Sequence, residues 1–173
     1  MAKNILMVIA PENFRDEELN HPREEFLAKG ADITIASTQK GVAAGMLGHK
    51  ENVDNTLEDV AGKTFDAVVI VGGRGSPTHL WDNALLHDIV RRHLELGKLV
   101  CSICLSGAVL AKAGILKGVD ATVWKEEDSL KVFSECGAHF IDKPVVVSGN
   151  IITGRGPFAA REFGQTIISE LVN

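Results

Sequence analysis

The hydrophobic residues of this chain fall into short continuous runs separated by stretches with helical periodicity. The runs occupy residues 3–10, 31–38, 66–71 and 97–103. An apolar run without alternation is typical of a strand that is covered on both faces, as in the interior of a parallel sheet. We therefore expect four strands, with residues 3–10 at the centre of a sheet.

The stretches between the runs predict helices. One begins with an acidic turn at Asp16, which the helix dipole favours, and ends at Gly30. Asn83 is a suitable N-cap for a second helix, which ends near Gly97. Further helices are expected from Cys104 to about residue 113, over residues 126–136, and after Pro157, which suits a first helical turn.

Three segments interrupt this alternation. Residues 41–55 carry three glycines and no clear period, which indicates a small hairpin or loop excursion. Residues 120–124 predict a short strand, and residues 144–153 a β-hairpin with a two-residue turn at Gly149-Asn150. Strands that alternate with helices predict an α/β fold with a mostly parallel sheet, helices on both faces and a single domain over residues 1–173.

Charge and composition narrow the expected partners. The 173 residues carry a formal net charge of −5 with no basic run, so neither nucleic acid nor an anionic membrane surface is expected. No apolar run approaches the roughly 20 residues of a membrane span, and residues 1–4 do not begin a leader. We expect a cytoplasmic protein whose three cysteines are thiols and whose six histidines, lacking ligand spacing, bind no metal.

Cys104 stands where the fourth apolar run turns into a helical pattern. A residue at such a break projects from the carboxyl edge of the sheet, in front of a helix N-terminus. That position stabilises a thiolate by about 0.3–1 kcal/mol, so a strongly acidic thiol needs a further partner. Cys101 lies about 10 Å along the strand, beyond the roughly 7 Å that a disulfide tolerates. We expect Cys101 and Cys136 to be inert core thiols, and no cofactor.

A glycine pair, Gly72-Gly73, follows the third apolar run. A dinucleotide fingerprint requires three spaced glycines that lead directly into a helix, and here Ser76-Pro77 intervenes. The pair therefore favours a tight turn whose amides face a site over a phosphate-binding loop.

Together these segments resemble the ThiJ/PfpI family of the class I glutamine amidotransferase-like superfamily. The matching segments are Ala10-x-x-x-Phe14-Arg15-Asp16-Glu17-Glu18, Gly72-Gly73, Ile103-Cys104-x-x-Gly107, Gly114-x-Leu116-x-Gly118, and Gly149-Asn150 followed by Thr153-Gly154-Arg155-Gly156-Pro157. The resemblance covers nearly the whole chain. It implies a flavodoxin-like three-layer sandwich, a nucleophile elbow at the cysteine, and a homodimer or higher homo-oligomer.

The resemblance also implies site residues. Cys104 takes the nucleophile position, Glu18 that of an acidic residue hydrogen-bonded to it, and the amides of Gly73 and Leu105 that of an oxyanion hole. An ionised carboxylate beside the sulfur would raise the thiol pKa by repulsion. We therefore predict a protonated Glu18 with a raised pKa, and a lowered pKa for Cys104.

The chain departs from the protease-like branch of the family. That branch has a histidine where this chain has Leu105, and a glutamate from a neighbouring subunit near residues 76–79. Trp124 can pack over a substrate but cannot act as a base. His79 is the candidate base, and Arg155 either meets an anionic substrate or is a surface charge. His21 lies near the site or an interface, and the sequence does not decide which.

The resemblance leaves three functions open. The first is thiolate attack on a small reactive carbonyl compound, or its adduct on a modified protein, as in a glyoxalase or deglycase. The second is a non-enzymatic redox or stress protein with an oxidisable Cys104. The third, an intracellular cysteine peptidase or hydrolase, is disfavoured because Leu105 removes the usual proton donor for an amine leaving group. A scaffold with a vestigial thiol is a further alternative, which the presence of Glu18 disfavours.

Overall fold

The central sheet of the computed structural model, which describes residues 1–173, has seven strands in the order β11-β12-β8-β7-β1-β3-β6. They are β1 (Asn4–Val8), β3 (Asp32–Ser37), β6 (Asn55–Thr56), β7 (Ala67–Ile70), β8 (Leu99–Ile103), β11 (Val145–Ser148) and β12 (Ile151–Gly154). Every neighbouring pair is parallel except β11 and β12, which form the predicted hairpin. The four apolar runs are thus β1, β3, β7 and β8.

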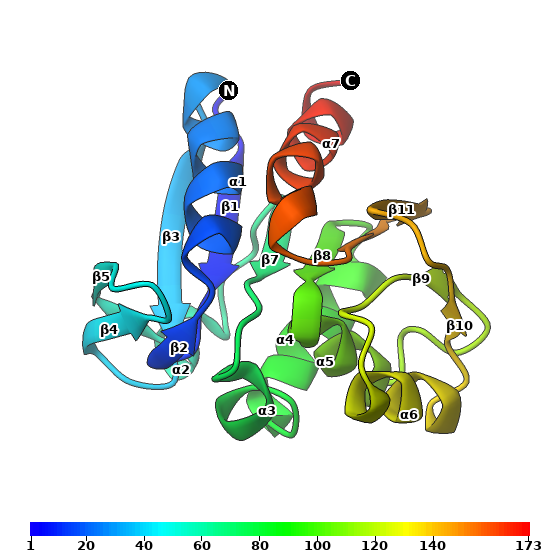
Figure 1. Ribbon diagram of the computed structural model, residues 1–173. Helices are drawn as coiled ribbons and strands as arrows, with labels where there is room; N and C mark the ends of the chain where they lie inside the picture. Colours follow the sequence, from blue (N-terminus) through cyan, green and yellow to red (C-terminus); the bar gives the residue numbers. More distant parts are fainter.

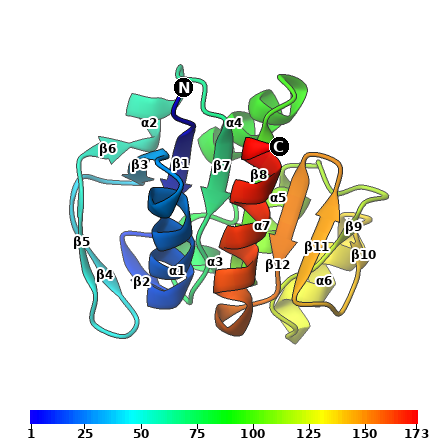
Figure 2. The ribbon, with the colours of Figure 1, turned by 90° about the horizontal axis from the view of Figure 1, so that it is seen from above.

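Helices cover both faces of this sheet. Helices α1 (Asp16–Ala28) and α7 (Ala160–Val172) lie side by side on one face (Figure 1). Helices α4 (Ala84–Glu95) and α5 (Gly107–Lys112) lie on the other (Figure 2). The remaining helices are α2 (Leu57–Val60), α3 (Ser76–His79) and α6 (Glu127–Glu135). This arrangement confirms the three-layer α/β sandwich, and Asn83 caps α4 by accepting a hydrogen bond from the Leu86 N–H, as predicted.

The middle of the sheet forms the core. All residues of β7, and all of β1 after its first residue, are buried, and residues 5–9 have no exposed surface. Because these strands are parallel, their carboxyl ends meet at one edge, where a ligand site is expected in an open α/β sheet. The segments that follow β1, β7 and β8 at this edge carry Arg15, Gly73 and Cys104.

Two smaller sheets flank the central one. Strands β4 (Gly41–Gly45) and β5 (Lys50–Val53) form the hairpin expected in residues 41–55. They are joined by β2 (Glu12–Phe14), which the sequence did not predict because its three residues stand beside Pro11. The second sheet pairs β9 (Asp120–Ala121) with β10 (His139–Phe140).

The structure corrects two predicted boundaries. The strand predicted over residues 120–124 ends at Ala121, because the Trp124 N–H donates a hydrogen bond to the Cys104 carbonyl instead of to a strand. The helix predicted directly after Cys104 begins with a 3-10 turn over Cys104–Ser106, and α5 itself starts at Gly107.

Candidate active site

Cys104 occupies a sharp turn at the carboxyl end of β8. Its φ of 60° lies in the left-handed region, which a residue other than glycine adopts at a cost of about 1–3 kcal/mol and which is typical of functional sites. The N–H groups of Leu105 and Gly73 lie beside the sulfur and favour its ionised form. These are the two amides that the family resemblance assigns to an oxyanion hole.

Buried polar side chains hold this turn from behind. The Ser106 hydroxyl donates to the Val71 carbonyl at 2.7 Å, so the Ser76 hydroxyl, 2.8 Å from Ser106 Oγ, must be the donor in that contact. Trp81 Nε1 donates to the Leu105 carbonyl at 2.8 Å. Sequence reasoning missed these contacts, since they join residues 71–81 to residues 105–106, two segments that meet only in the folded protein.

Glu18 faces the cysteine from the first turn of α1. Its side chain has no exposed surface; Oε1 accepts a hydrogen bond from the Gly72 N–H at 3.0 Å, and Oε2 has no hydrogen-bond partner. The Cys104 thiol is the polar group within reach of this carboxyl. Gly72 separates the two residues, because a Cβ added there would lie 2.6 Å from Glu18 Oε1 and 2.7 Å from Cys104 Cβ.

Burial governs the protonation of this pair. It raises the pKa of Glu18 to about 8, against the opposing effect of the hydrogen bonds with Cys104 and Gly72. Burial, followed by the charge of an ionised Glu18, also raises the pKa of the Cys104 thiol, although the amides of Leu105 and Gly73 lower it. The predicted rise for Glu18 agrees with the structure. The lowered pKa predicted for Cys104 is wrong, since burial and like charge outweigh the amides.

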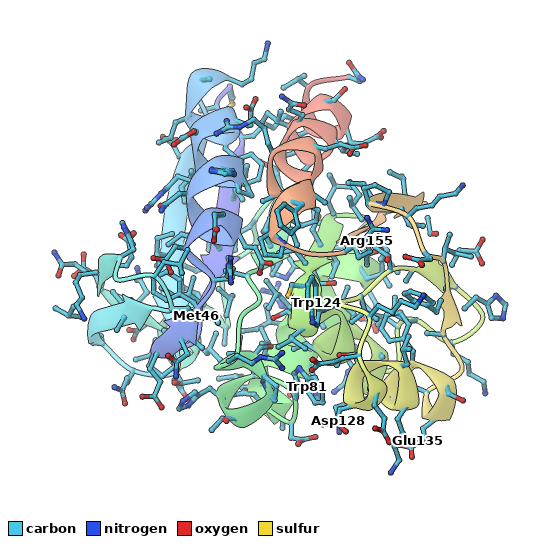
Figure 3. The ribbon with its side chains drawn as sticks, in the orientation of Figure 1. Met46, Trp81, Trp124, Asp128, Glu135 and Arg155 are labelled. Carbon is cyan, nitrogen blue, oxygen red and sulfur yellow. The ribbon has the colours of Figure 1, made fainter.

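The sulfur opens into a small cavity of about 140 Å³. This is well below the roughly 300–1,000 Å³ of pockets for drug-sized ligands, so the cavity suits a ligand of few atoms. It is lined by Arg15, Met46, Gly73, Arg74, Cys104, Leu105, Trp124 and Pro157. Trp124 forms one wall and Met46 belongs to the β4–β5 loop, and both are labelled in Figure 3.

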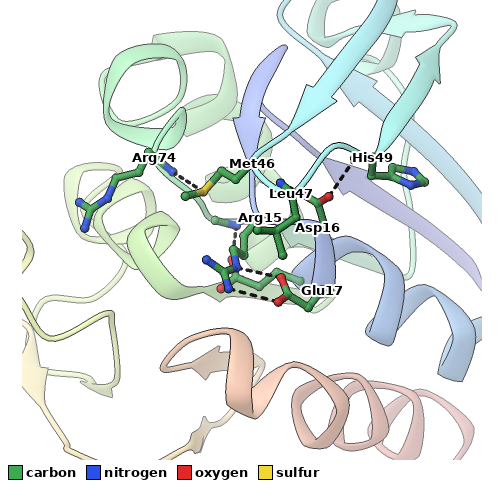
Figure 4. Close-up of polar contacts among 9 residues, drawn as sticks. Arg15, Asp16, Glu17, Met46, Leu47, His49 and Arg74 are labelled. Atoms are coloured by element: carbon green, nitrogen blue, oxygen red, sulfur yellow. Dashed lines mark hydrogen bonds and ion pairs between the residues drawn. The ribbon is translucent and has the colours of Figure 1, made fainter.

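A buried carboxylate holds the loop that carries Met46. Asp16 Oδ1 accepts from the Leu47 N–H at 3.0 Å and Oδ2 from the His49 N–H at 2.9 Å (Figure 4). The Arg74 N–H donates to Met46 Sδ at 3.4 Å. The acidic first turn of α1 therefore has two roles: Glu18 lies beside the cysteine, and Asp16 holds the loop that forms part of the cavity wall.

Comparison with known proteins identifies the family. The family model described as DJ-1/PfpI matches residues 3–170. The chain belongs to the DJ-1/PfpI family. This confirms the resemblance drawn from the sequence.

Relatives in the DJ-1/PfpI family include proteins with and without a named activity. An uncharacterized protein of Methanocaldococcus jannaschii is 44% identical over 96% of this chain and 82% of its own. Deglycase PfpI of Pyrococcus furiosus is 34% identical over 88% of this chain and 90% of its own. The glutathione-independent glyoxalase DJR-1.2 of Caenorhabditis elegans is 27% identical over 98% and 89%.

The fold is shared with solved DJ-1/PfpI structures. The crystal structure of a ThiJ/PfpI domain protein from Brachyspira murdochii superposes with a TM-score of 0.92 at 33% identity, covering 99% of this chain and 97% of that one. The flavodoxin-like architecture is therefore that of the family. None of the helices combines the length and the apolar character that crossing a membrane requires.

Two histidines and one arginine that the sequence analysis considered for the site do not line the cavity. His79 pairs with Glu12 Oε1 at 3.2 Å and does not line the cavity, so it is not placed to act as a base there. Arg155 pairs with Asp142 at 3.0 Å and lines two neighbouring hollows that share Trp124 with the cavity. His21 lies on α1 and is not among the lining residues.

The structure adds Arg15, Met46, Arg74 and Pro157 to the site. Arg15 stands within a quoted motif, next to Asp16. Arg74 directly follows Gly72-Gly73, and its proximity to this glycine turn was a usable signal. No sequence signal pointed to Met46, because its loop has no periodicity and is held at the site by the Asp16 contacts.

Proposed function

We propose that this chain is a cysteine-dependent enzyme that acts on small reactive carbonyl compounds, such as α-oxoaldehydes, or on their adducts with proteins. The observation that carries the proposal is the Cys104 sulfur, held between a fully buried carboxyl group and two amide N–H groups at the base of a small cavity. The deglycase and glyoxalase names of family relatives support the same chemistry.

In the first step, Cys104 Sγ adds to the carbonyl carbon of an aldehyde. The S–C bond forms as the C=O π bond opens to an alkoxide, and the thiol proton passes to Oε2 of the ionised Glu18 carboxylate, the oxygen that has no hydrogen-bond partner. The amides of Gly73 and Leu105 stabilise the alkoxide. Because the pKa of this carboxyl is about 8, it is mostly protonated at pH 7, and the ionised fraction that can accept the thiol proton grows as the pH approaches 8.

Later steps need only this carboxyl and water. Glu18 first returns the thiol proton to the alkoxide, which gives a hemithioacetal and regenerates the carboxylate. For an α-oxoaldehyde, this carboxylate then carries the proton of the former aldehyde carbon to the neighbouring carbonyl carbon, which converts the hemithioacetal into a thioester. Water then hydrolyses the thioester and frees the thiol. For methylglyoxal the sum is methylglyoxal plus water to lactate, with no external oxidant or reductant.

Two alternative functions fit the site less well. Peptide hydrolysis needs a proton donor for the amine leaving group, and the position after the nucleophile is Leu105, while His79 is paired elsewhere. A redox sensor typically has an exposed thiol of low pKa, whereas Cys104 is 6% exposed and its pKa is raised by burial.

A lactate assay with methylglyoxal tests the proposal. We expect turnover by the unaltered protein and by Cys136→Ala, which removes a half-exposed thiol outside the site, and its loss in Cys104→Ala and Glu18→Gln. Equal, negligible turnover in all four proteins would contradict the enzyme. Mass spectrometry after mild peroxide then asks whether Cys104 alone gains oxygen, as the redox alternative requires.

A further inference from the structure

Two arginines line the cavity in which Cys104 lies. Arg15 and Arg74 are its only lining residues with a charged side chain at neutral pH, apart from the thiol that can ionise. Their acidic partners, Glu17 and Glu126, do not line the cavity. The cavity is therefore lined by two basic residues and by no acidic one, although the chain as a whole is acidic.

Both guanidinium groups retain free donors. Arg15 uses Nε and Nη2 on the two oxygens of Glu17, at 2.8 and 3.2 Å, which leaves Nη1 without a partner (Figure 4). Arg74 uses Nη1 on Glu126 at 3.0 Å, which leaves Nε and Nη2 free. The Glu17 contacts also fix the orientation of Arg15, whose side chain is 29% exposed. A guanidinium held in this way is suited to bind a carboxylate.

The two arginines lie close enough to the sulfur to interact with it. The negative charge that Cys104 can carry raises the pKa of both arginines, after the larger effects of their glutamate partners. The cavity measures about 140 Å³, so a ligand whose carbonyl carbon contacts the sulfur keeps all its other atoms nearby. An anionic group on such a ligand must therefore lie within a few atoms of the reactive carbonyl.

We propose that Arg15 and Arg74 make this site selective for small carbonyl compounds that carry a carboxylate within a few atoms of the reactive carbonyl. The inference rests on the proposed use of Cys104 as the nucleophile and adds the substrate class. The two arginines are specificity-determining residues, since they bind the substrate's charge and take no part in bond formation.

Alkylation of Cys104 by a matched pair of reagents tests this selectivity. Iodoacetate and iodoacetamide have nearly the same size and differ in charge; each forms an S–C bond as the C–I bond breaks and iodide leaves. The rates are measured at pH 9 by mass spectrometry of the Cys104 peptide. The quantity of interest is the ratio of the iodoacetate rate to the iodoacetamide rate.

We expect Arg15→Gln and Arg74→Gln each to lower this ratio by about two- to fivefold, the usual range for a partly exposed ion pair. The double variant should lower it by about tenfold. Arg91→Gln, which removes an exposed arginine of α4 paired with Asp88, is the matched control and should leave the ratio unchanged. Glyoxylate should likewise protect Cys104 from iodoacetamide at a lower concentration in the unaltered protein than in the double variant, with no such difference for glycolaldehyde.

The outcomes separate this inference from other roles of the arginines. If both alkylation rates fall together at a constant ratio, the arginines act only on the charge of the sulfur, and the proposed selectivity is wrong. An unchanged pair of rates also overturns it. The methylglyoxal assay is independent: a protein without turnover that keeps the iodoacetate preference would contradict the proposed enzyme and leave the anion selectivity standing.

Discussion

Replacement of Glu18 by glutamine should stabilise the protein near neutral pH. Burial raises the pKa of this carboxyl from its ordinary value of 4.5 to about 8. The folded protein therefore holds a proton that the unfolded chain releases between these two values. Since stability falls with pH wherever the folded state binds more protons, Glu18 destabilises the fold progressively from about pH 4.5 to pH 8.

The magnitude follows from the pKa values. One pKa unit corresponds to about 1.36 kcal/mol, so the interval from 4.5 to about 8 amounts to about 5 kcal/mol above pH 8. Roughly 3 kcal/mol of this is already lost at pH 7. Glutamine has the same shape and keeps an acceptor for the Gly72 N–H, but it does not titrate.

Urea unfolding of both proteins at several values between pH 4.5 and pH 9 measures the effect. The difference in the free energy of unfolding isolates Glu18, because the other titratable groups are common to both proteins. We expect the variant to gain steadily on the unaltered protein as the pH rises and to stop gaining above pH 8. A difference that stays constant with pH would refute the assignment of a protonated, buried Glu18.

Three further predictions concern the same edge of the sheet. Gly72→Ala should lower the free energy of unfolding in urea by about 1–3 kcal/mol and slow the alkylation of Cys104, because the new Cβ would lie 2.6 Å from both Glu18 Oε1 and the Ile103 carbonyl oxygen. Unchanged stability and alkylation would show that the Glu18 and Cys104 side chains are not held across this glycine. Ser106→Ala should destabilise by about 1–3 kcal/mol, and more than Ser76→Ala, since it alone leaves the Val71 carbonyl unpaired; an equal loss in urea unfolding would contradict the donor assignment. Turnover of methylglyoxal should rise with pH to a plateau above about pH 8, and a rate independent of pH between 6 and 9 would exclude ionisation of the Glu18 pair as the controlling step.

The fold could be predicted from the chain because its strongest signals are local. The continuous apolar runs of β1 and β7 can be covered only inside a sheet. Asn83 marks the start of α4 because its side chain accepts a hydrogen bond from the N–H of Leu86, only three residues further along the chain. β2 could not be found in this way, because it is held by its pairing with β4, a segment about 30 residues away that has no periodicity of its own.

The sequence analysis named Cys104, Glu18 and the raised pKa of Glu18, but it missed four residues of the cavity and the direction of the thiol's pKa shift. Cys104 and Glu18 occupy the positions that the motifs imply, but the sign of the thiol's pKa shift depends on how deeply the sulfur is buried, which no local pattern encodes. His79 was a candidate because its loop follows Gly73, and Arg155 because it stands within a quoted glycine-rich motif. Their carboxylate partners, Glu12 and Asp142, turn both away from the cavity.

Three features that lower the stability of the folded protein lie around the Cys104 sulfur. Cys104 has a left-handed backbone conformation, and Glu18 is buried without a partner for Oε2. Glu18 also keeps its proton at pH values at which an ordinary carboxyl group is ionised. Each lowers stability, and each has a use in the proposed chemistry: the turn exposes the sulfur to two amides, the open oxygen receives the thiol proton, and the raised pKa lets that proton return. A fold selected for stability alone would replace Glu18 with an uncharged side chain of similar volume. The stabilised Glu18→Gln protein should therefore be the inactive one, and a variant that was both more stable and fully active would break the link between the cost and the function.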